Sequence, residues 1–124
     1  MTTLLARNAD VLVTMDAARR EIAGGGLFAR DGVIEAVGST AELPTAADEV
    51  IELSGAVVTP GLVNTHHHFY QNLTRAVPAA QDATLFGWLK TLYPIWARMG
   101  PDAIRVTATL ALAEMALAGA TCSS

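Results

Sequence analysis

The sequence has little cysteine, little charge and no long uninterrupted apolar run, and each scarcity excludes a class of protein. The single cysteine, Cys122, excludes an intrachain disulfide framework and favours a reducing, cytoplasmic compartment. Eight lysines and arginines stand scattered against twelve acidic residues, which argues against a basic nucleic-acid surface. The most apolar run, 103–118, contains Arg105 and Glu114 and is too short to span a bilayer, so no membrane partner is expected.

Apolar residues, in contrast, are abundant for a chain of this size. The 124 residues (13.0 kDa) are 52% hydrophobic and 16% charged, with a mean hydropathy of +0.36. Such a length forms at most one ordinary domain, and a free-standing small domain rarely tolerates so apolar a composition. We therefore expect part of the apolar surface to pack against further protein.

All three histidines stand in one run, within the stretch TPGLVNTHHHFYQ at 59–71. Side chains alternate along a strand, so His66 and His68 would project to one face and His67 to the other. Two imidazoles on one face can bind one Zn, Fe, Ni or Cu ion. His67 is then predicted to face surrounding helices or a partner outside the ligand pair. A solvated histidine loop is the alternative.

The residues around the histidines form a longer motif. Pro60-Gly61 is followed by two apolar residues, Asn64, a small residue and His-x-His, an order that resembles the first-strand signature of the amidohydrolase superfamily. The continuation HFYQNLTRA at 68–76, then QD at 81–82 and LFGWL at 85–89, is similar to the branch of 8-oxoguanine deaminases and hydroxyatrazine hydrolases. The resemblance extends over essentially the whole chain.

The resemblance implies an α/β fold class, the start of a metal-dependent (β/α)8 TIM barrel preceded by half of a small β-sandwich. Residues 1–58 would form the β-sheet module and residues 59–124 the first β/α units of the barrel. Such a barrel needs on the order of 250 residues, so the chain is expected to be an incomplete, amino-terminal portion. The histidines would end barrel strand 1, Leu62–His66, at the edge where these barrels place active sites.

Local patterns predict several strands and turns. Leu4–Thr14 is predicted as one or two short strands with a bend at Asn8–Asp10. Asp31-Gly32 between two β-prone runs predicts a two-residue hairpin, and Gly24-Gly25-Gly26 predicts a flexible turn. Cys122 would lie in the second barrel strand as a buried, unreactive thiol.

Two helices are predicted after the histidine run. The first covers 84–99, with Trp88 and Trp96 assigned to its core, and Pro94 should kink or split it. The second covers 101–118, and the spacing of its apolar residues predicts a buried face formed by Ile104, Thr107, Ala108, Ala111, Met115 and Ala118.

The resemblance also implies an activity, that of a zinc-dependent aminohydrolase that deaminates 8-oxoguanine or a related purine or triazine. One Zn²⁺ per active site is expected, with Fe²⁺ as the alternative, and His66 and His68 are the predicted ligands. A further His, an Asp ligand and the proton-transferring Glu and His would come from later strands. No catalytic residue is therefore expected within this chain, which alone is predicted to be inactive. Gln71 is the predicted substrate contact, because an amide both donates and accepts hydrogen bonds; a solvent-facing loop residue is the alternative.

Two other functions stay open from the sequence. A ring-opening amidase or a triazine dechlorinase would share the same first-strand motif. A non-catalytic metal-binding fragment would need only the two histidines. The expected partners are a small heterocyclic substrate and either the remainder of the barrel or further copies in a homo-oligomer.

Overall fold

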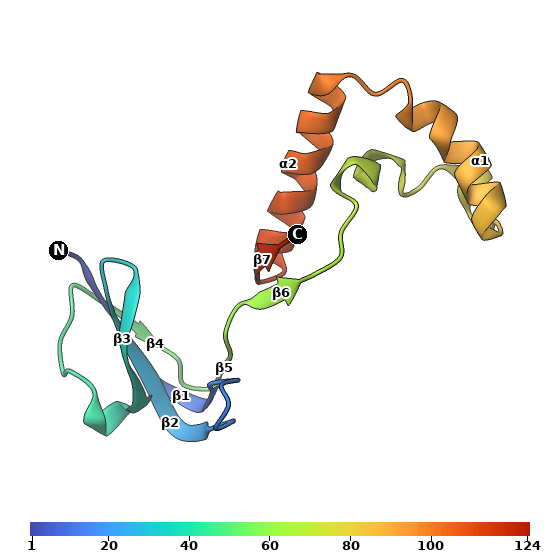
Figure 1. Cartoon of the computed structure of the whole chain (residues 1–124). Coiled ribbons are helices and arrows are strands. Elements are labelled where there is room, and N and C mark those ends of the chain that lie inside the picture. The colour runs from blue at the N-terminus through green and yellow to red at the C-terminus, as the bar shows by residue number, and fades with distance from the viewer. The chain divides into compact units, whose positions relative to one another are not determined.

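The computed structural model describes residues 1–124, which divide into two compact units, Met1–Pro60 and Gly61–Ser124 (Figure 1). The first unit is a sheet of five strands with one short 3-10 helix. Its elements are β1 (Thr3–Val13), β2 (Glu21–Arg30), β3 (Val33–Ser39), η1 (Thr40–Glu42), β4 (Glu49–Glu52) and β5 (Val57–Val58).

The sheet of the first unit has the order β3-β2-β1-β4, and β5 also pairs with β1. β1, β2 and β3 pair antiparallel, whereas β4 and β5 run parallel to β1. The predicted hairpin is confirmed at Asp31 and Gly32, whose φ angles of 49° and 82° give the left-handed turn that matches strand twist. Leu5 and Phe28 pack on Leu43 beyond η1 and form the buried core of this unit.

The prediction of a flexible turn at Gly24–Gly26 is wrong, because the three glycines lie inside β2. They face a shift in the pairing register of β1 between Ala6 and Ala9. A Cβ added to Gly26 would lie 2.5 Å from the carbonyl oxygen of Ala6. Glycine here permits the close approach of two backbones at a bulge. In the sequence, glycines at a bulge look the same as glycines that form a turn. β1 itself is one strand, with Asn8 at φ 61° where the bend was predicted.

The second unit places two helices between two parallel strands. β6 (Leu62–Asn64) is followed by η2 (Phe69–Thr74), η3 (Pro78–Ala80), α1 (Leu85–Trp96) and α2 (Pro101–Leu117), and the chain returns in β7 (Ala120–Ser123) beside β6. Parallel strands need such a crossover, so the mixed α/β class predicted from the sequence is confirmed.

Both helices begin and end at residues that favour helix termini. The Thr84 side chain accepts a hydrogen bond from the amide of Gly87 and caps α1, and Pro101 occupies the first turn of α2. Gly119, with φ 82°, ends α2. Pro94 does not split α1, because it lies two residues from the end of the helix, where losing one backbone donor interrupts little of the ladder.

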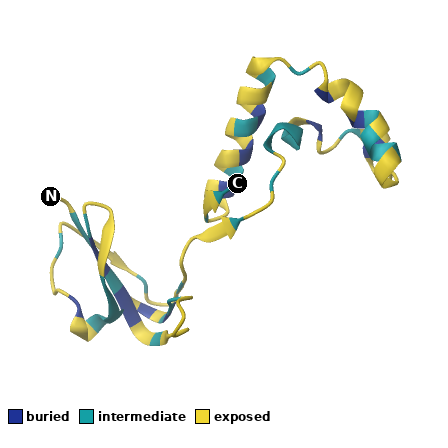
Figure 2. Cartoon of the chain, viewed as in Figure 1, coloured by how far each residue is buried: buried dark blue, intermediate teal, exposed yellow.

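Burial in the second unit is confined to a few side chains (Figure 2). Leu92 and Trp96 form a buried cluster with Ala80, against which Tyr70 and Trp88 pack, so the core assignment of both tryptophans is confirmed. On α2, Thr107, Ala111 and Met115 are buried as predicted, whereas Ile104 and Ala118 are exposed.

Cys122, which was predicted to be buried, and several large apolar side chains are exposed in the second unit. Cys122 is exposed instead of buried, because β7 pairs with β6 along one edge only. Large apolar side chains are also exposed on both helices, among them Phe86 and Leu117 at 73% and 91% of their area. Neither helix is long and apolar enough to cross a membrane.

Candidate metal centre

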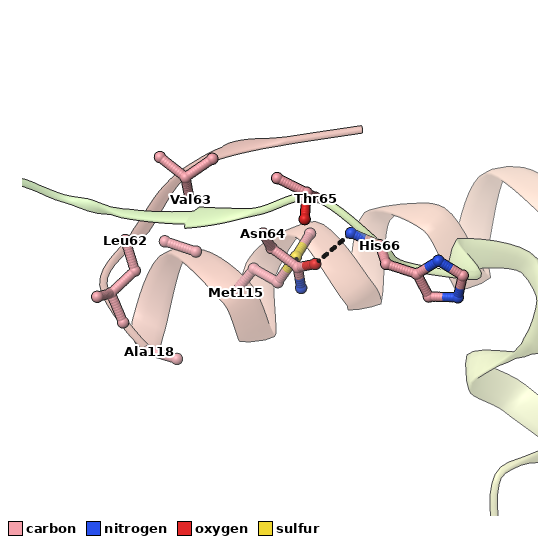
Figure 3. A pocket seen from close by; sticks show the side chains of 8 residues that line it. Leu62, Val63, Asn64, Thr65, His66, Met115 and Ala118 are labelled. Carbon is pink, nitrogen blue, oxygen red and sulfur yellow. Dashed lines mark hydrogen bonds between the residues drawn. The ribbon is translucent and has the colours of Figure 1, made fainter.

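The histidine run follows the end of β6. β6 stops at Asn64, two residues earlier than predicted, and the chain then runs without regular structure to His68, the residue that precedes η2. The Asn64 side chain fixes this exit, since its Oδ1 accepts the amide of His66 at 3.0 Å and its Nδ2 lies 3.5 Å from Met115 Sδ on α2 (Figure 3).

His66 and His68 converge although neither lies within the strand. Their Nε2 atoms are 2.9 Å apart, and the ring centroids are 4.8 Å apart at an interplanar angle of 67°. Imidazole nitrogens are common zinc ligands, and two of them converge here, so the pair fits the metal predicted from the sequence.

No third donor joins the pair within this chain. No group of three His, Cys, Asp or Glu side chains is placed so that it could hold a metal ion. Catalytic zinc sites use three protein ligands and one open position. His66 and His68 could therefore supply two of the ligands of such a site, and the others would have to come from outside this chain.

Gln71 lies beside this pair, on η2. Its Nε2 is 3.3 Å from Nδ1 of His68 and donates to the hydroxyl of Tyr70 at 3.1 Å. This contact with the far ring nitrogen restrains the orientation of the His68 imidazole. The sequence had predicted Gln71 as a substrate contact and gave no signal for its contact with His68.

Comparison with known proteins extends this picture, although no protein-family model matches the chain. It is 47% identical over 100 residues to 8-oxoguanine deaminase of Pseudomonas aeruginosa, covering 80% of the chain and 22% of that protein. It is 35% identical over 134 residues to hydroxydechloroatrazine ethylaminohydrolase of Pseudomonas sp. (strain ADP), covering 98% of the chain and 27% of that protein.

Solved structures give the same relationship. A zinc complex of atrazine chlorohydrolase from Arthrobacter aurescens superposes with a TM-score of 0.88 at 31% identity, covering 97% of the chain and 28% of that protein. A zinc-bound adenosine deaminase from Xanthomonas campestris superposes at 0.87 with 32% identity, covering 98% and 28%.

The chain belongs to the amidohydrolase superfamily. It spans about a quarter of the length of the relatives it matches and corresponds to their amino-terminal part. The resemblance read from the histidine motif is thereby confirmed.

His67 of this amidohydrolase chain stands apart from the other two histidines. Its ring packs against Phe69, with centroids 4.8 Å apart, and its Nδ1 is buried without a hydrogen-bond partner. That His67 lies outside a ligand pair stays a prediction.

Glu114 of α2 binds two residues of the segment after the histidines, Asn72 in η2 and Arg75 directly after it. Asn72 Nδ2 donates to Glu114 Oε2 at 3.0 Å, and Arg75 Nη1 lies 2.8 Å from both carboxylate oxygens. The hydrogen bond from Asn72, and after it the one from Arg75, lower the pKa of Glu114, which keeps its carboxylate ionised. A sequence separation of about forty residues hides such contacts from any local pattern.

An open hollow of about 450 Å³ lies between β6 and the end of α2 (Figure 3). It is lined by Leu62, Val63, Asn64, Thr65, His66, Met115, Ala118 and Ala120. Only His66 in this lining carries an ionisable group. The hollow is therefore mainly apolar and reaches the histidine pair through His66.

Proposed function

We propose that this chain forms the amino-terminal part of a zinc-dependent aminohydrolase, in which His66 and His68 hold the metal ion. The proposal is carried by the 2.9 Å approach of the two Nε2 atoms at the end of β6. Within a complete (β/α)8 barrel, of which β6 and β7 would be the first two strands, this end is where the active site lies. Bound zinc supplies a Lewis acid that activates water at neutral pH.

The substrate class follows from the relatives. By their names, the relatives reported above act on ring systems that carry amino or chloro groups. The relative that is 47% identical is an 8-oxoguanine deaminase. We infer that the full-length protein, meaning this chain with any sequence that continues it, hydrolyses an amino group from 8-oxoguanine or a related purine or triazine. The remaining ligands and proton-transferring groups would come from the rest of the barrel, in the cytoplasm.

The role of Gln71 in this reaction is inferred from the hydrogen-bond donors and acceptors around His68. When Nε2 of His68 binds a metal, the ring proton sits on Nδ1 and needs an acceptor. Gln71 Nε2 faces His68 Nδ1 and the Tyr70 hydroxyl in the structure, but the two ends of a side-chain amide are nearly isosteric. With metal bound, the amide turned over by about 180° would place Oε1 beside both groups, where it accepts from each. Its NH₂ group is then free to donate to a carbonyl oxygen of a bound ring.

Replacement of Gln71 by leucine is expected to raise KM for the ring substrate about tenfold at saturating zinc, because one hydrogen bond is lost. Gln71→Asn keeps the amide group but shortens the side chain by one methylene, so the amide no longer reaches the ring. It is expected to raise KM similarly. Steady-state kinetics of the full-length protein measure both. An unchanged KM would assign Gln71 to a loop that does not contact substrate.

Ammonia release from 8-oxoguanine by the zinc-loaded full-length protein tests the proposed function directly. We expect turnover that stops when His66 and His68 are both replaced. A second candidate, dechlorination of a triazine, is supported by the atrazine chlorohydrolase superposition at a TM-score of 0.88. Chloride release without ammonia release would favour it. Release of neither product from either ring class would overturn both and leave a metal-binding fragment.

A further inference from the structure

The segment that carries Gln71 has little structure of its own to hold it. η2 is a six-residue 3-10 helix that begins directly after His68, and no side chain caps its start. Short 3-10 helices have poorer hydrogen-bond geometry than α-helices. The position of η2, and of the imidazole at its start, therefore depends on contacts made by other elements.

One of these contacts comes from Thr107 in the middle of α2. Its side chain is fully buried, and its Oγ1 donates to the carbonyl of Phe69 at 3.0 Å and accepts the amide of Leu73 at 3.2 Å. Both partners belong to η2, so one hydroxyl fixes the segment at its first turn and again one turn later.

The second contact is the cluster of Glu114, Asn72 and Arg75. Besides their bonds to the carboxylate, Arg75 Nη1 reaches Asn72 Oδ1 at 3.3 Å, so the three side chains close a triangle. Glu114 lies seven residues, or about two helical turns, beyond Thr107 and thus on the same face of α2. The two residues hold η2 at separate points along the helix.

We propose that Glu114 is a positioning residue for the histidine pair His66 and His68. It would act through Asn72 and Arg75 on the segment that holds His68 and Gln71. This inference rests on the proposed function. The Glu114 and Arg75 side chains are 40% and 61% exposed, and ion pairs so exposed contribute little to global stability. We therefore expect the cluster to act on the local geometry of η2 and to contribute little to the free energy of unfolding.

The experiment compares Glu114→Ala with Asp102→Asn in the full-length protein. Asp102 also lies on α2 and pairs with an arginine, Arg105, but that pair is more exposed and does not contact η2. We expect Glu114→Ala to raise the zinc dissociation constant, measured by chelator competition, about tenfold. Its melting temperature should match that of Asp102→Asn, and its cobalt-substituted absorption spectrum should change.

Amide hydrogen exchange in the metal-free protein separates this inference from the proposed function. We expect Glu114→Ala to speed amide exchange within η2 (Phe69–Thr74) and to leave exchange within α2 unchanged. Unchanged exchange together with an unchanged cobalt spectrum would overturn the role of Glu114, even if the wild-type protein binds zinc. A wild-type protein that binds no zinc would overturn the proposed function, and with it the claim that Glu114 positions a metal-binding histidine pair.

A charge exchange gives the rescue control. The double variant Arg75→Glu with Glu114→Arg restores an ion pair across the same gap but cannot accept the bond from Asn72. We expect it to recover part of the zinc affinity lost in Glu114→Ala. Affinity no better than that of Glu114→Ala would contradict an action through the Arg75 pair.

Discussion

Replacement of His68 by alanine is expected to lower the zinc affinity of the full-length protein more than a hundredfold and to abolish turnover. The four-ligand zinc sites of zinc-finger peptides bind the ion with about 10–16 kcal/mol, so on that scale one ligand accounts for about 3 kcal/mol. That loss corresponds to a factor above one hundred in the dissociation constant. Chelator competition measures the affinity, and ammonia release at saturating zinc measures turnover.

His67→Ala is the matched control for this prediction, because it removes the neighbouring imidazole, which packs on Phe69 instead of the pair. We expect its zinc affinity to stay close to that of the wild-type protein. Equal losses for the two variants would contradict the assignment of His66 and His68 as the ligand pair and would favour a non-specific effect of the histidine run.

Replacement of Trp96 by alanine is expected to cost about 3–5 kcal/mol of unfolding free energy, the usual range for a large aromatic residue in a core. Trp96 is 9% exposed and packs edge-on against Tyr70, Trp88 and Tyr93, with ring centroids 5.2–5.4 Å away. Its Nε1 also donates to Thr74 Oγ1 at 2.9 Å, which joins α1 to the end of η2. Urea unfolding followed by circular dichroism measures the loss.

Two further variants separate the contributions of Trp96. Trp96→Phe keeps most of the ring contacts and removes the bond to Thr74, so we expect a loss of about 1 kcal/mol beyond that caused by the smaller ring. Lys90→Ala, at an exposed position of α1, is expected to change stability by less than about 0.5 kcal/mol. A Trp96→Ala loss as small as that of Lys90→Ala would show that the aromatic cluster is not a core.

The features predicted correctly from the sequence are those set by residues close together along the chain. The Asp31-Gly32 hairpin depends on two left-handed residues between β-prone runs, and α2 depends on Pro101 and Gly119 at its ends. Strand alternation predicted that His66 and His68 share one face. Their rings do lie close together, but both residues lie beyond β6, where Asn64 and Gln71 contact them, and their role as ligands stays a prediction.

The features missed are those set by contacts distant in sequence. Gly25 and Gly26 were assigned to a turn because the register shift that demands them lies in another strand. The bonds of Thr107 to η2 and of Glu114 to Asn72 span 34 to 42 residues and leave no local pattern. Burial of Cys122 was expected from its place in a predicted barrel strand, but β7 pairs with β6 alone in this chain and leaves the thiol exposed.

The central claim, a zinc site built on His66 and His68, is tested most directly by a native mass spectrum of the full-length protein with and without chelator. The account predicts one zinc-sized mass per protomer that chelator removes, and a metal-free spectrum for the variant in which both histidines are alanine. A protomer that stays metal-free in excess zinc, or a double variant that keeps its zinc, would contradict it.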